Sequence, residues 1–484
     1  MMLLHELVKN ISFKGHSDNR EIKSITYDSR KVKPGTLFVA ISGMQDDGHE
    51  YIPQAIENGA VAVLSNGRSP KTREIPILQV QDPRIAMSHI SAEFYGHPSK
   101  KMNIIGVTGT NGKTSITHIL QHILKKSNIN CGTLGTLGFH TPSGMISTGF
   151  TTPESVELQQ MLSTLLMAGV RDVAMEISSH ALNLHRVADV DVNIAVFSNL
   201  TPEHLDFHSD MESYFQSKLK LFTKLNNKNT AVINCDDPYA ERIMEETSSN
   251  IFTYGMDNHA DLYPVDIEYG LNGIQAQLQC GNIVVPVKSN LVGTYNLYNI
   301  MAATSVCLRM DIQPEIISQA MLQDLVIPGR LEAIPTNTKQ GKIFIDYAHT
   351  PDAYEKIFST ISSLCSEETA IYTVFGCGGN RDNSKRSEMA TIAEKYADFV
   401  IVTTDNPRTE SLEAINSDIV SGFKGNNYEI ILNRKDAIYR MMDQMDERSI
   451  LLVLGKGVEN FQEIGSEKIP YNDKDTIRSY KSAG

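Results

Sequence analysis

The chain lacks the features that mark membrane-spanning, secreted and nucleic-acid-binding proteins. No apolar stretch reaches the roughly 18 residues that a transmembrane helix needs. The apolar start Met1–Leu4 is interrupted by His5 and Glu6, so we expect no signal peptide. The net charge is −13, which argues against a general surface for nucleic acid or anionic membranes.

Cysteine is also sparse. The six cysteines are scattered and form no C-x-x-C pair, which favours free thiols in a reducing compartment and predicts a cytoplasmic protein. We find no low-complexity tract and no internal repeat. The composition, 41% hydrophobic and 21% charged, is that of an ordinary globular protein, and 484 residues suggest about three domains.

Short apolar runs alternate with helical stretches, which predicts an α/β fold. We expect an N-terminal α/β domain over residues 1–98, a central domain with a mainly parallel sheet over 99–329, and a doubly wound Rossmann-like domain over 330–484. The polar segment His97–Lys101 is the expected linker between the first two. Residues 261–290 look more like antiparallel hairpins than helix. Strands are expected at 35–41, 60–64, 172–176, 192–197, 230–234, 342–346, 370–375, 399–403 and 450–454.

The segment Ile104–Thr114 is the most informative part of the sequence. An apolar run enters a glycine-rich turn that ends in Gly-Lys-Thr, with helix-compatible residues behind it. In such a turn, backbone N–H groups and a helix N-terminus face an anion, Lys113 adds a point charge, and the Thr114 hydroxyl can bind Mg²⁺. The loop is a variant, because Val107 stands where a strict P-loop has glycine. We expect it to bind a nucleoside triphosphate.

Polar residues also follow the strands of the central block. Glu176 closes one strand, and His204 and His208 follow another. Beside the Gly-Lys-Thr loop, such groups could hold Mg²⁺ directly or through water. The i, i+4 spacing of the two histidines leaves zinc as an alternative, although no H-E-x-x-H pattern is present. Loop histidines that only form hydrogen bonds are a further alternative.

The last block carries charged residues after three of its strands. Arg381 and Arg408 offer planar forks suited to a carboxylate, while Asp405, Asn406 and Glu459 can receive an ammonium group. Each position taken alone is more often a structural turn. Three such turns at the ends of strands in one sheet favour a zwitterionic, amino-acid-like ligand.

The ordered series of motifs resembles the Mur ligase superfamily, the ATP-dependent amide-forming enzymes of peptidoglycan precursor synthesis. Within it, the chain is most similar to the enzymes that add the third residue of the stem peptide. The resemblance covers almost the whole chain. It is carried by Asp28–Arg30, Thr108–Thr114, Thr151–Pro153, Glu176–His180, His204–Asp206, Tyr214–Lys218, Asn296–Asn299, Gly329–Glu332, Asp346–Pro351 and Asp405–Arg408.

This resemblance implies a ligase that adds meso-diaminopimelate to UDP-N-acetylmuramoyl-L-alanyl-D-glutamate through an acyl phosphate, with ATP as co-substrate and Mg²⁺ as cofactor. It implies a monomer with a UDP-substrate-binding N-terminal domain, a central ATP-binding domain and a C-terminal domain that recruits the amino acid. Lys218 matches a lysine that family members carbamylate, and the catalytic set is Lys113, Lys218 and His204.

The family's binding residues carry over position by position. ATP-binding positions are Gly109, Thr110, Asn111, Gly112, Lys113, Thr114, Asn299, Arg330 and Asp346. UDP-substrate positions are Ser29, Thr151, Thr152, Ser178 and Arg186, with the 45–49 segment also a candidate. Diaminopimelate positions are Arg381, Asp405, Asn406, Arg408, Gly455 and Glu459. The metal ligands are Thr114, Glu176, His204 and Lys218 as its carbamate.

Several positions depart from the family pattern, which keeps alternatives open. Val458 stands where relatives usually have histidine, Glu203 and Asn380 replace aspartates, and Leu184 replaces a polar residue of some members. The same reaction with L-lysine or another diamino acid is one alternative. Others are another ligase of the superfamily, acting on folates or on D-alanyl-D-alanine, and a non-catalytic nucleotide or UDP-sugar sensor.

Overall fold

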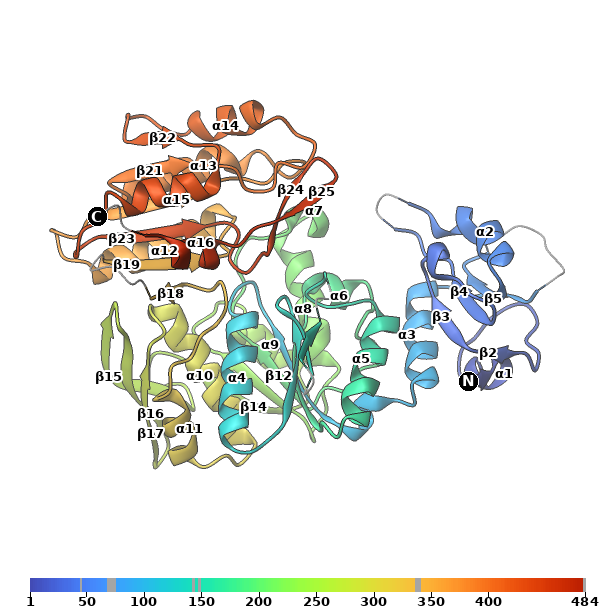
Figure 1. Ribbon diagram of the computed structural model, residues 1–484. Coiled ribbons are helices and arrows are strands. Elements are labelled where there is room, and N and C mark those ends of the chain that lie inside the picture. The colour runs from blue at the N-terminus through green and yellow to red at the C-terminus, as the bar shows by residue number, and fades with distance from the viewer. Residues whose placement is uncertain (44–45, 68–74, 142–143, 147–148, 336–340, 482–484) are drawn as a thin grey trace. The chain divides into compact units, whose positions relative to one another are not determined.

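A computed structural model describes residues 1–43, 46–67, 75–141, 144–146, 149–335 and 341–481 (Figure 1). The chain divides into two compact units. The first comprises Met1–Pro264, Leu278–Val285 and Tyr298–Ala320, and the second Val265–Gln277, Pro286–Leu297 and Met321–Gly484. Among the described residues, no helix is long and apolar enough to span a bilayer.

The N-terminal part of the first unit is built on a four-stranded parallel sheet, β3-β4-β5-β6. Alternate residues of β4 face opposite sides: Leu37 and Val39 pack with one apolar cluster and Phe38 with another. Helices α2 and α3 supply the partners on the two sides. The elements are β1 (Met2–Leu3), α1 (Leu4–Leu7), β2 (Glu21–Ile22), β3 (Ser24–Thr26), β4 (Thr36–Val39), α2 (Ile52–Glu57), β5 (Ala60–Ser65), β6 (Ile77–Gln79) and α3 (Pro83–Phe94).

The expected linker is a short 3-10 helix, η3 (Pro98–Lys101). Ser99 is buried there, accepts a hydrogen bond from the backbone N–H of Asp191 at 3.1 Å, and donates to its carboxylate at 3.3 Å. The segment is therefore tied to the central part of the unit by specific hydrogen bonds.

The central sheet has eight strands in the order β10-β9-β8-β11-β7-β12-β13-β14. All pairs from β8 to β14 are parallel, and β9 and β10 add an antiparallel edge. The strands are β7 (Asn103–Thr108), β8 (Cys131–Gly135), β9 (Gly138–Thr141), β10 (Gly144–Ile146), β11 (Asp172–Glu176), β12 (Ile194–Phe197), β13 (Thr230–Asn234) and β14 (Asn250–Tyr254). The helices are α4 (Lys113–Lys126), α5 (Ser155–Met167), α6 (Ser179–Asn183), α7 (Leu205–His208), α8 (Met211–Thr223) and α9 (Ala240–Glu246).

The position of β7 determines where a ligand can bind. This strand lies between β11 and β12, and the connections that follow it run first toward β8 on one side and later to β12 on the other. Strand order therefore reverses at β7, and open α/β sheets bind ligands beyond the carboxyl ends of strands at such a point. The glycine-rich loop, Glu176 and the segment after β12 all lie at this edge.

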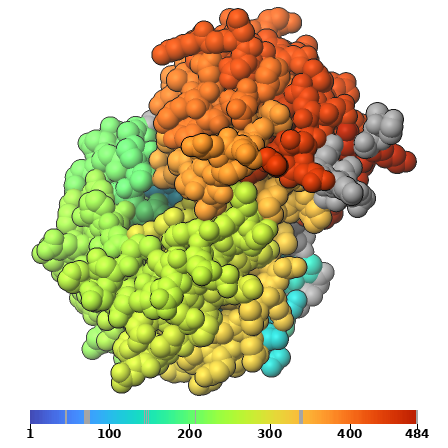
Figure 2. Space-filling view, turned by 90° about the vertical axis from the view of Figure 1, so that its left-hand side faces the viewer, coloured from blue at the N-terminus to red at the C-terminus, as the bar shows by residue number. Residues whose placement is uncertain are grey.

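The stretch expected to form hairpins is a three-stranded sheet, β15 (Tyr263–Gly270), β16 (Gly273–Cys280) and β17 (Ile283–Ser289). Two-residue connections join successive strands, and only antiparallel neighbours can be joined so briefly. This region lies at the surface (Figure 2), where Val265, Ile283 and Val284 are exposed. Helices α10 (Thr294–Arg309) and α11 (Pro314–Met321) follow.

The second unit contains a six-stranded sheet, β18-β19-β23-β20-β21-β22, in which only β18 is antiparallel. Alternate residues of β23 face two apolar clusters, one with α12, α13 and α14 and the other with α15 and α16. Its elements are β18 (Glu332–Ile334), β19 (Lys342–Asp346), α12 (Pro351–Leu364), β20 (Ile371–Phe375), α13 (Lys385–Tyr396), β21 (Phe399–Val402), α14 (Leu412–Val420), β22 (Tyr428–Ile430), α15 (Arg434–Met442), β23 (Ile450–Leu454), β24 (Phe461–Ile464), β25 (Glu467–Pro470) and α16 (Asp473–Ser479).

Candidate functional site

The turn between β7 and α4 has the geometry of an anion-binding loop. Gly109 and Gly112 have φ values of 150° and 89°, which side chains rarely tolerate. A Cβ at Gly109 would lie 1.9 Å from the Ser198 hydroxyl, and one at Gly112 would lie 2.5 Å from Oδ1 of Asn299. Helix α4 begins directly after Gly112, so the N-terminus of the helix lies at the loop, where the helix dipole favours an anion.

The segment after β12 holds this loop in place. Asn199 accepts a hydrogen bond from the Asn111 backbone at its side-chain oxygen (2.9 Å) and one from the Thr110 backbone at its carbonyl (2.8 Å). Ser198 donates to the Asn111 carbonyl at 2.6 Å, and the Thr110 hydroxyl donates to the Thr201 carbonyl at 3.1 Å. The loop is therefore preorganised by neutral hydrogen bonds, a role of Ser198 and Asn199 that the sequence analysis missed.

Two lysines converge on the loop from different helices. Lys113 donates to the carbonyl oxygens of Gly109 and Thr110, both at 2.8 Å. Lys218, only 1% exposed, donates to the same Gly109 carbonyl at 2.9 Å, and its ammonium lies 4.6 Å from the centre of the Tyr214 ring. Burial, with the nearby charge of Lys113, holds the pKa of Lys218 well below its usual value. A lysine in this state is a reactive amine.

Oxygen atoms gather around Glu176 at the end of β11. Its carboxylate accepts hydrogen bonds from the Thr114 hydroxyl at 3.0 Å and from the backbone and hydroxyl of Thr136 at 2.9 and 3.1 Å. The Thr136 hydroxyl also lies 3.1 Å from that of Thr151. Oxygen ligands of this kind fit Mg²⁺, which takes few protein ligands together with waters and phosphate oxygens. Thr136, which follows β8, was not anticipated.

The histidines form a cluster of rings that meet edge to face beside α8. The His204 ring lies 4.8 Å from that of His180, with left-handed backbone geometry at His204. His208 is buried and shares hydrogen bonds with the hydroxyls of Ser179 (2.8 Å) and Ser217 (3.4 Å). Among the described residues, no three His, Cys, Asp or Glu side chains gather as a metal site. The zinc alternative therefore gains no support.

Thr152, Ser178 and Arg186 lie together next to Glu176. The Thr152 hydroxyl donates to the Glu176 carbonyl at 2.9 Å and accepts from the Ser178 backbone at 3.1 Å. Arg186 donates to the Thr152 carbonyl at 2.9 Å and forms an ion pair with the buried Glu154 at 2.9 Å. The structure thus brings three of the five predicted UDP-substrate residues together, and Thr151 adjoins them in the chain.

Ser29 lies apart from this group, in the N-terminal sheet. It is buried at the start of η1 (Ser29–Lys31), and its hydroxyl donates to the side chain of Gln54 at 3.0 Å. The backbone carbonyl of Ser29 accepts from the Asn58 side chain at 3.2 Å. Residue Gln45 of the candidate 45–49 segment lies outside the described residues.

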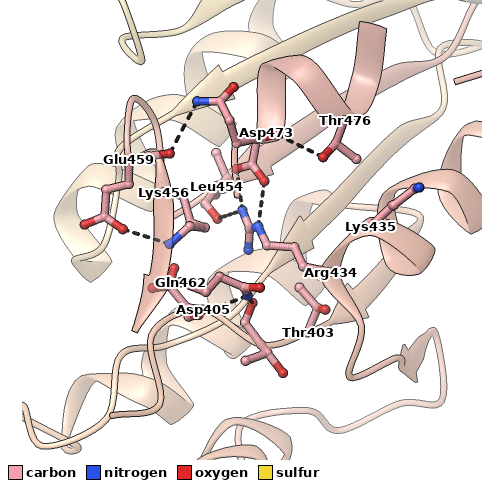
Figure 3. Close-up of polar contacts among 12 residues, drawn as sticks. Thr403, Asp405, Arg434, Lys435, Leu454, Lys456, Glu459, Gln462, Asp473 and Thr476 are labelled. Atoms are coloured by element: carbon pink, nitrogen blue, oxygen red, sulfur yellow. Dashed lines mark hydrogen bonds and ion pairs between the residues drawn. The ribbon is translucent and has the colours of Figure 1, made fainter. Parts of the chain in front are cut away.

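In the second unit, Asp405 and Glu459 lie beyond the carboxyl ends of β21 and β23 (Figure 3), and Asn406 follows Asp405 in the chain. Asn406 donates to Glu459 at 2.8 Å, and the fully buried Lys456 donates to both, at 3.1 Å to Asn406 and 2.8 Å to Glu459. Gly455 leaves room for Asp405, whose carboxylate would lie 2.7 Å from a Cβ at that position. Lys456 was missed by the sequence analysis, which assigned Gly455 and Glu459 of this turn to the acceptor.

A completely buried ion pair supports this cluster of polar residues, where we expect the acceptor to bind. Arg434, which begins α15, donates to the Asp473 carboxylate through two nitrogens, at 2.7 and 2.8 Å, and to the Leu454 carbonyl at 3.0 Å (Figure 3). Asp405 is itself buried, which raises the pKa of its carboxyl, while the positive charges of Lys456 and Arg434 oppose that rise. The pocket therefore holds several charges away from water.

Arg408 lies beside this cluster and has a left-handed backbone, with φ of 50°. Its Nε donates to the Glu463 carboxylate at 3.0 Å and its Nη1 to the Gly379 carbonyl at 2.7 Å. Arg381 is exposed on the loop after β20. Both predicted arginines thus follow strands of one parallel sheet, as expected.

The remaining predicted nucleotide residues, Arg330 and Asp346, also belong to the second unit. Asp346 is buried and accepts backbone hydrogen bonds from Leu331 at 2.6 Å and Ala348 at 2.7 Å, and burial raises the pKa of its carboxyl. The Arg330 guanidinium lies 5.3 Å from the centre of the Tyr347 ring. Arg330 and Asp346 therefore lie on neighbouring segments that hydrogen bonds join.

Comparison with known proteins agrees with this geometry. Three family models match in succession: the Mur ligase family catalytic domain at residues 21–95, the Mur ligase middle domain at 107–307, and the Mur ligase glutamate ligase domain at 329–457.

Individual relatives match over the full length. The UDP-N-acetylmuramoyl-L-alanyl-D-glutamate–2,6-diaminopimelate ligase of Syntrophomonas wolfei is 38% identical over 480 residues, and that of Clostridioides difficile is 39% identical over 482, each covering 98% of both chains. A solved structure of a ligase with the same name has a TM-score of 0.71 and 30% identity, covering 99% of this chain and 98% of that one. The expected family and three-domain α/β architecture are confirmed, and the chain belongs to the Mur ligase family.

Proposed function

We propose that this protein is an ATP-dependent ligase of peptidoglycan precursor synthesis, which adds meso-diaminopimelate to UDP-N-acetylmuramoyl-L-alanyl-D-glutamate. The observation that carries the proposal is the full-length similarity to ligases of that name, at 38 and 39% identity. The charged pocket after β21 supports the choice of acceptor, because it offers both arginines and carboxylates to an amino acid with two zwitterionic heads.

The reaction proceeds in two steps. A carboxylate oxygen of the UDP-linked dipeptide attacks the γ-phosphorus of ATP, which forms an acyl phosphate and releases ADP. The neutral amine of the acceptor then attacks the acyl carbon. The tetrahedral intermediate loses phosphate, and the amine nitrogen gives up a proton, leaving the new amide bond.

The loop between β7 and α4 provides the electrostatic part of the first step. We assign Lys113 to the transferring phosphoryl group, where charge is crowded and a preorganised cation lowers the barrier. Thr114 and Glu176 would hold Mg²⁺, with His204 as a further ligand; the ion would neutralise phosphate charge. Asn299, Arg330 and Asp346 are assigned to the rest of the nucleotide.

Lys218 is proposed to act as a carbamate. Its depressed pKa favours the neutral amine, and a neutral amine that adds CO₂ and releases a proton becomes a carbamate anion with two oxygen ligands. The carbamate anion would also be attracted by the charge of Lys113, which repels the protonated amine. Two observations support the assignment: Lys218 is buried, and it donates a hydrogen bond to the same carbonyl that Lys113 contacts.

The substrate contacts follow the same reasoning. We assign Ser29, Thr151, Thr152, Ser178 and Arg186 to the UDP-linked dipeptide. For the acceptor, Arg408 and Arg381 would bind the distal carboxylate, and Asp405, Asn406 and Glu459 the distal ammonium, with Gly455 keeping the pocket open. L-Lysine has no carboxylate at that end and would leave the arginines without a ligand.

We also propose domain boundaries after residues 98 and 329 and a cytoplasmic location, where ATP and the UDP-linked dipeptide are available. The first boundary falls between the segments that two family models match, and the second lies at the first residue of the third matched segment.

An acceptor screen tests the proposed function. Purified protein is given ATP, Mg²⁺ and the UDP-linked dipeptide with diaminopimelate, L-lysine or L-ornithine, and both ADP and the tripeptide product are measured. We expect diaminopimelate to give much the highest kcat/KM. Preference for L-lysine would replace the acceptor assignment, and no ADP with any acceptor would favour the non-catalytic sensor.

A further inference from the structure

The hairpin formed by β24 and β25 is bound closely to the loop that carries Asp405 to Arg408. The backbone N–H of Arg408 donates to the Glu463 carbonyl at 3.0 Å, and the Gly465 N–H donates to the Arg408 carbonyl at 2.7 Å. The side chain of Gln462 donates to the carbonyls of Thr404 and Asp405, both at 3.1 Å. The hairpin therefore fixes the backbone of the predicted acceptor loop.

These contacts explain how Arg408 keeps an unusual conformation. A left-handed backbone is uncommon for a residue with a long side chain, and it persists when surrounding bonds determine it. Both backbone groups of Arg408 are bonded to the hairpin, and Asn406 accepts a further hydrogen bond from the Glu463 N–H at 2.9 Å. The guanidinium group of Arg408 therefore extends from a backbone whose position is fixed.

The side chain of Glu463 adds a second level of control. Its carboxylate accepts a hydrogen bond from Nε of Arg408 at 3.0 Å, while the Gly379 carbonyl accepts one from Nη1 at 2.7 Å. Among the described residues, no hydrogen bond involves Nη2 of Arg408. The guanidinium is planar, so two fixed nitrogens fix the whole plane and leave one outer edge for a substrate carboxylate. Both side chains are partly exposed, at 24% for Arg408 and 30% for Glu463, so a ligand can reach them.

We propose that Glu463 is a positioning residue for the acceptor, which orients Arg408 toward the distal carboxylate of the incoming diamino acid. This inference rests on the proposed function. Arginine has many rotamers, and holding one of them before the substrate arrives removes an ordering cost from binding. Glu463 acts only through Arg408, so its effect appears in the KM for an acceptor that carries a second carboxylate.

Two substitutions separate positioning from charge. Glu463→Ala removes the acceptor for Nε but leaves every backbone contact of the hairpin. Glu463→Gln keeps an oxygen in the same place and removes the negative charge. We expect Glu463→Ala to raise the KM for diaminopimelate about tenfold with kcat unchanged, and Glu463→Gln to stay near the parent value. KM values for ATP and the UDP-linked dipeptide are expected to remain unchanged in both variants.

Two controls make the result specific. Glu467→Ala removes an exposed carboxylate on the other strand of the same hairpin and is expected to leave every KM unchanged. In an Arg408→Ala background, Glu463→Ala is expected to have no further effect, because its partner is gone. Thermal unfolding of each variant checks that the fold is intact.

The outcomes that overturn the proposal differ from failure of the function itself. An unchanged or lower KM in Glu463→Ala, an equal loss in Glu463→Gln, or a further loss in the Arg408→Ala background would each refute positioning by Glu463. A parent enzyme that ligates no acceptor would instead refute the proposed function.

Discussion

The loop after β7 and the pocket after β21 hold their polar groups by different means. The loop is fixed by neutral hydrogen bonds from Ser198 and Asn199, and its lysines donate to backbone carbonyl oxygens. The pocket is fixed by ion pairs, among them Arg434–Asp473 and Lys456–Glu459. A carbonyl oxygen carries no net charge, so these bonds position Lys113 without neutralising its ammonium group. The pocket has nearly balanced charges, which suits selection of a zwitterion.

The largest effect is expected at the loop. Lys113→Met removes the cation that we assign to the transferring phosphoryl group and should lower kcat/KM by about 10³-fold. ADP release measures the loss, and thermal unfolding is expected to change little. The matched control is Lys125→Met, an exposed lysine near the other end of α4. Near-normal activity of Lys113→Met would mean that the loop's N–H groups suffice.

Breaking the buried ion pair near Asp405 should lower the stability of the protein. Arg434→Met leaves the Asp473 carboxylate buried without its partner, and we expect a loss of about 3–5 kcal/mol of unfolding free energy. Denaturant unfolding followed by circular dichroism measures it. The double variant with Asp473→Leu should recover most of the loss, and Lys435→Met, an exposed neighbour on α15, should cost little. Equal losses in the single and double variants would contradict this account.

A smaller and more selective effect is expected for Arg408→Ala. Loss of a charge-assisted contact with the distal carboxylate should raise the KM for diaminopimelate about thirtyfold, with the KM values for ATP and the UDP-linked dipeptide unchanged. Steady-state kinetics with each substrate varied in turn test this. If the KM for diaminopimelate does not move, the acceptor assignment is wrong.

The smallest effect concerns pH and CO₂. The pKa of Lys218 is lowered in the fold, so the amine is protonated only below that lowered pKa and is neutral above it. Only the neutral form adds CO₂, so added bicarbonate should raise kcat of CO₂-depleted enzyme several-fold at alkaline pH and less as pH falls. Mass spectrometry of native protein should detect the adduct. A kcat that does not depend on CO₂ at any pH would contradict carbamylation.

Much of the central fold could be predicted because its signals are local. The strands at 172–176, 230–234, 342–346 and 450–454 have the predicted bounds, and the Gly-Lys-Thr sequence located the loop and helix α4. The helix begins at Lys113, directly after Gly112, whose left-handed backbone forms the turn into the helix. The antiparallel edge of β9 and β10 was missed, since short strands near a turn give little periodicity.

The supporting residues of the site could not be predicted from the sequence. Arg434 and Asp473 are 39 positions apart and look like ordinary surface residues at helix starts, yet neither is exposed. Thr136 reaches Glu176 only because β8 lies beside β11 in the sheet. Such partners depend on strand order, which a single sequence does not state. The predicted binding roles themselves stay predictions until the experiments above are done.

The shared contact of Lys113 and Lys218 with one carbonyl sets an order of assembly. Burial, and after it the positive charge of Lys113, lowers the pKa of Lys218 and favours its neutral amine while the loop holds no anion. A triphosphate would offset the charge of Lys113, draw a proton onto Lys218 and make it a poorer nucleophile toward CO₂. The carbamylation that we propose is therefore expected to form more readily in the nucleotide-free enzyme, and early binding of ATP is expected to disfavour it.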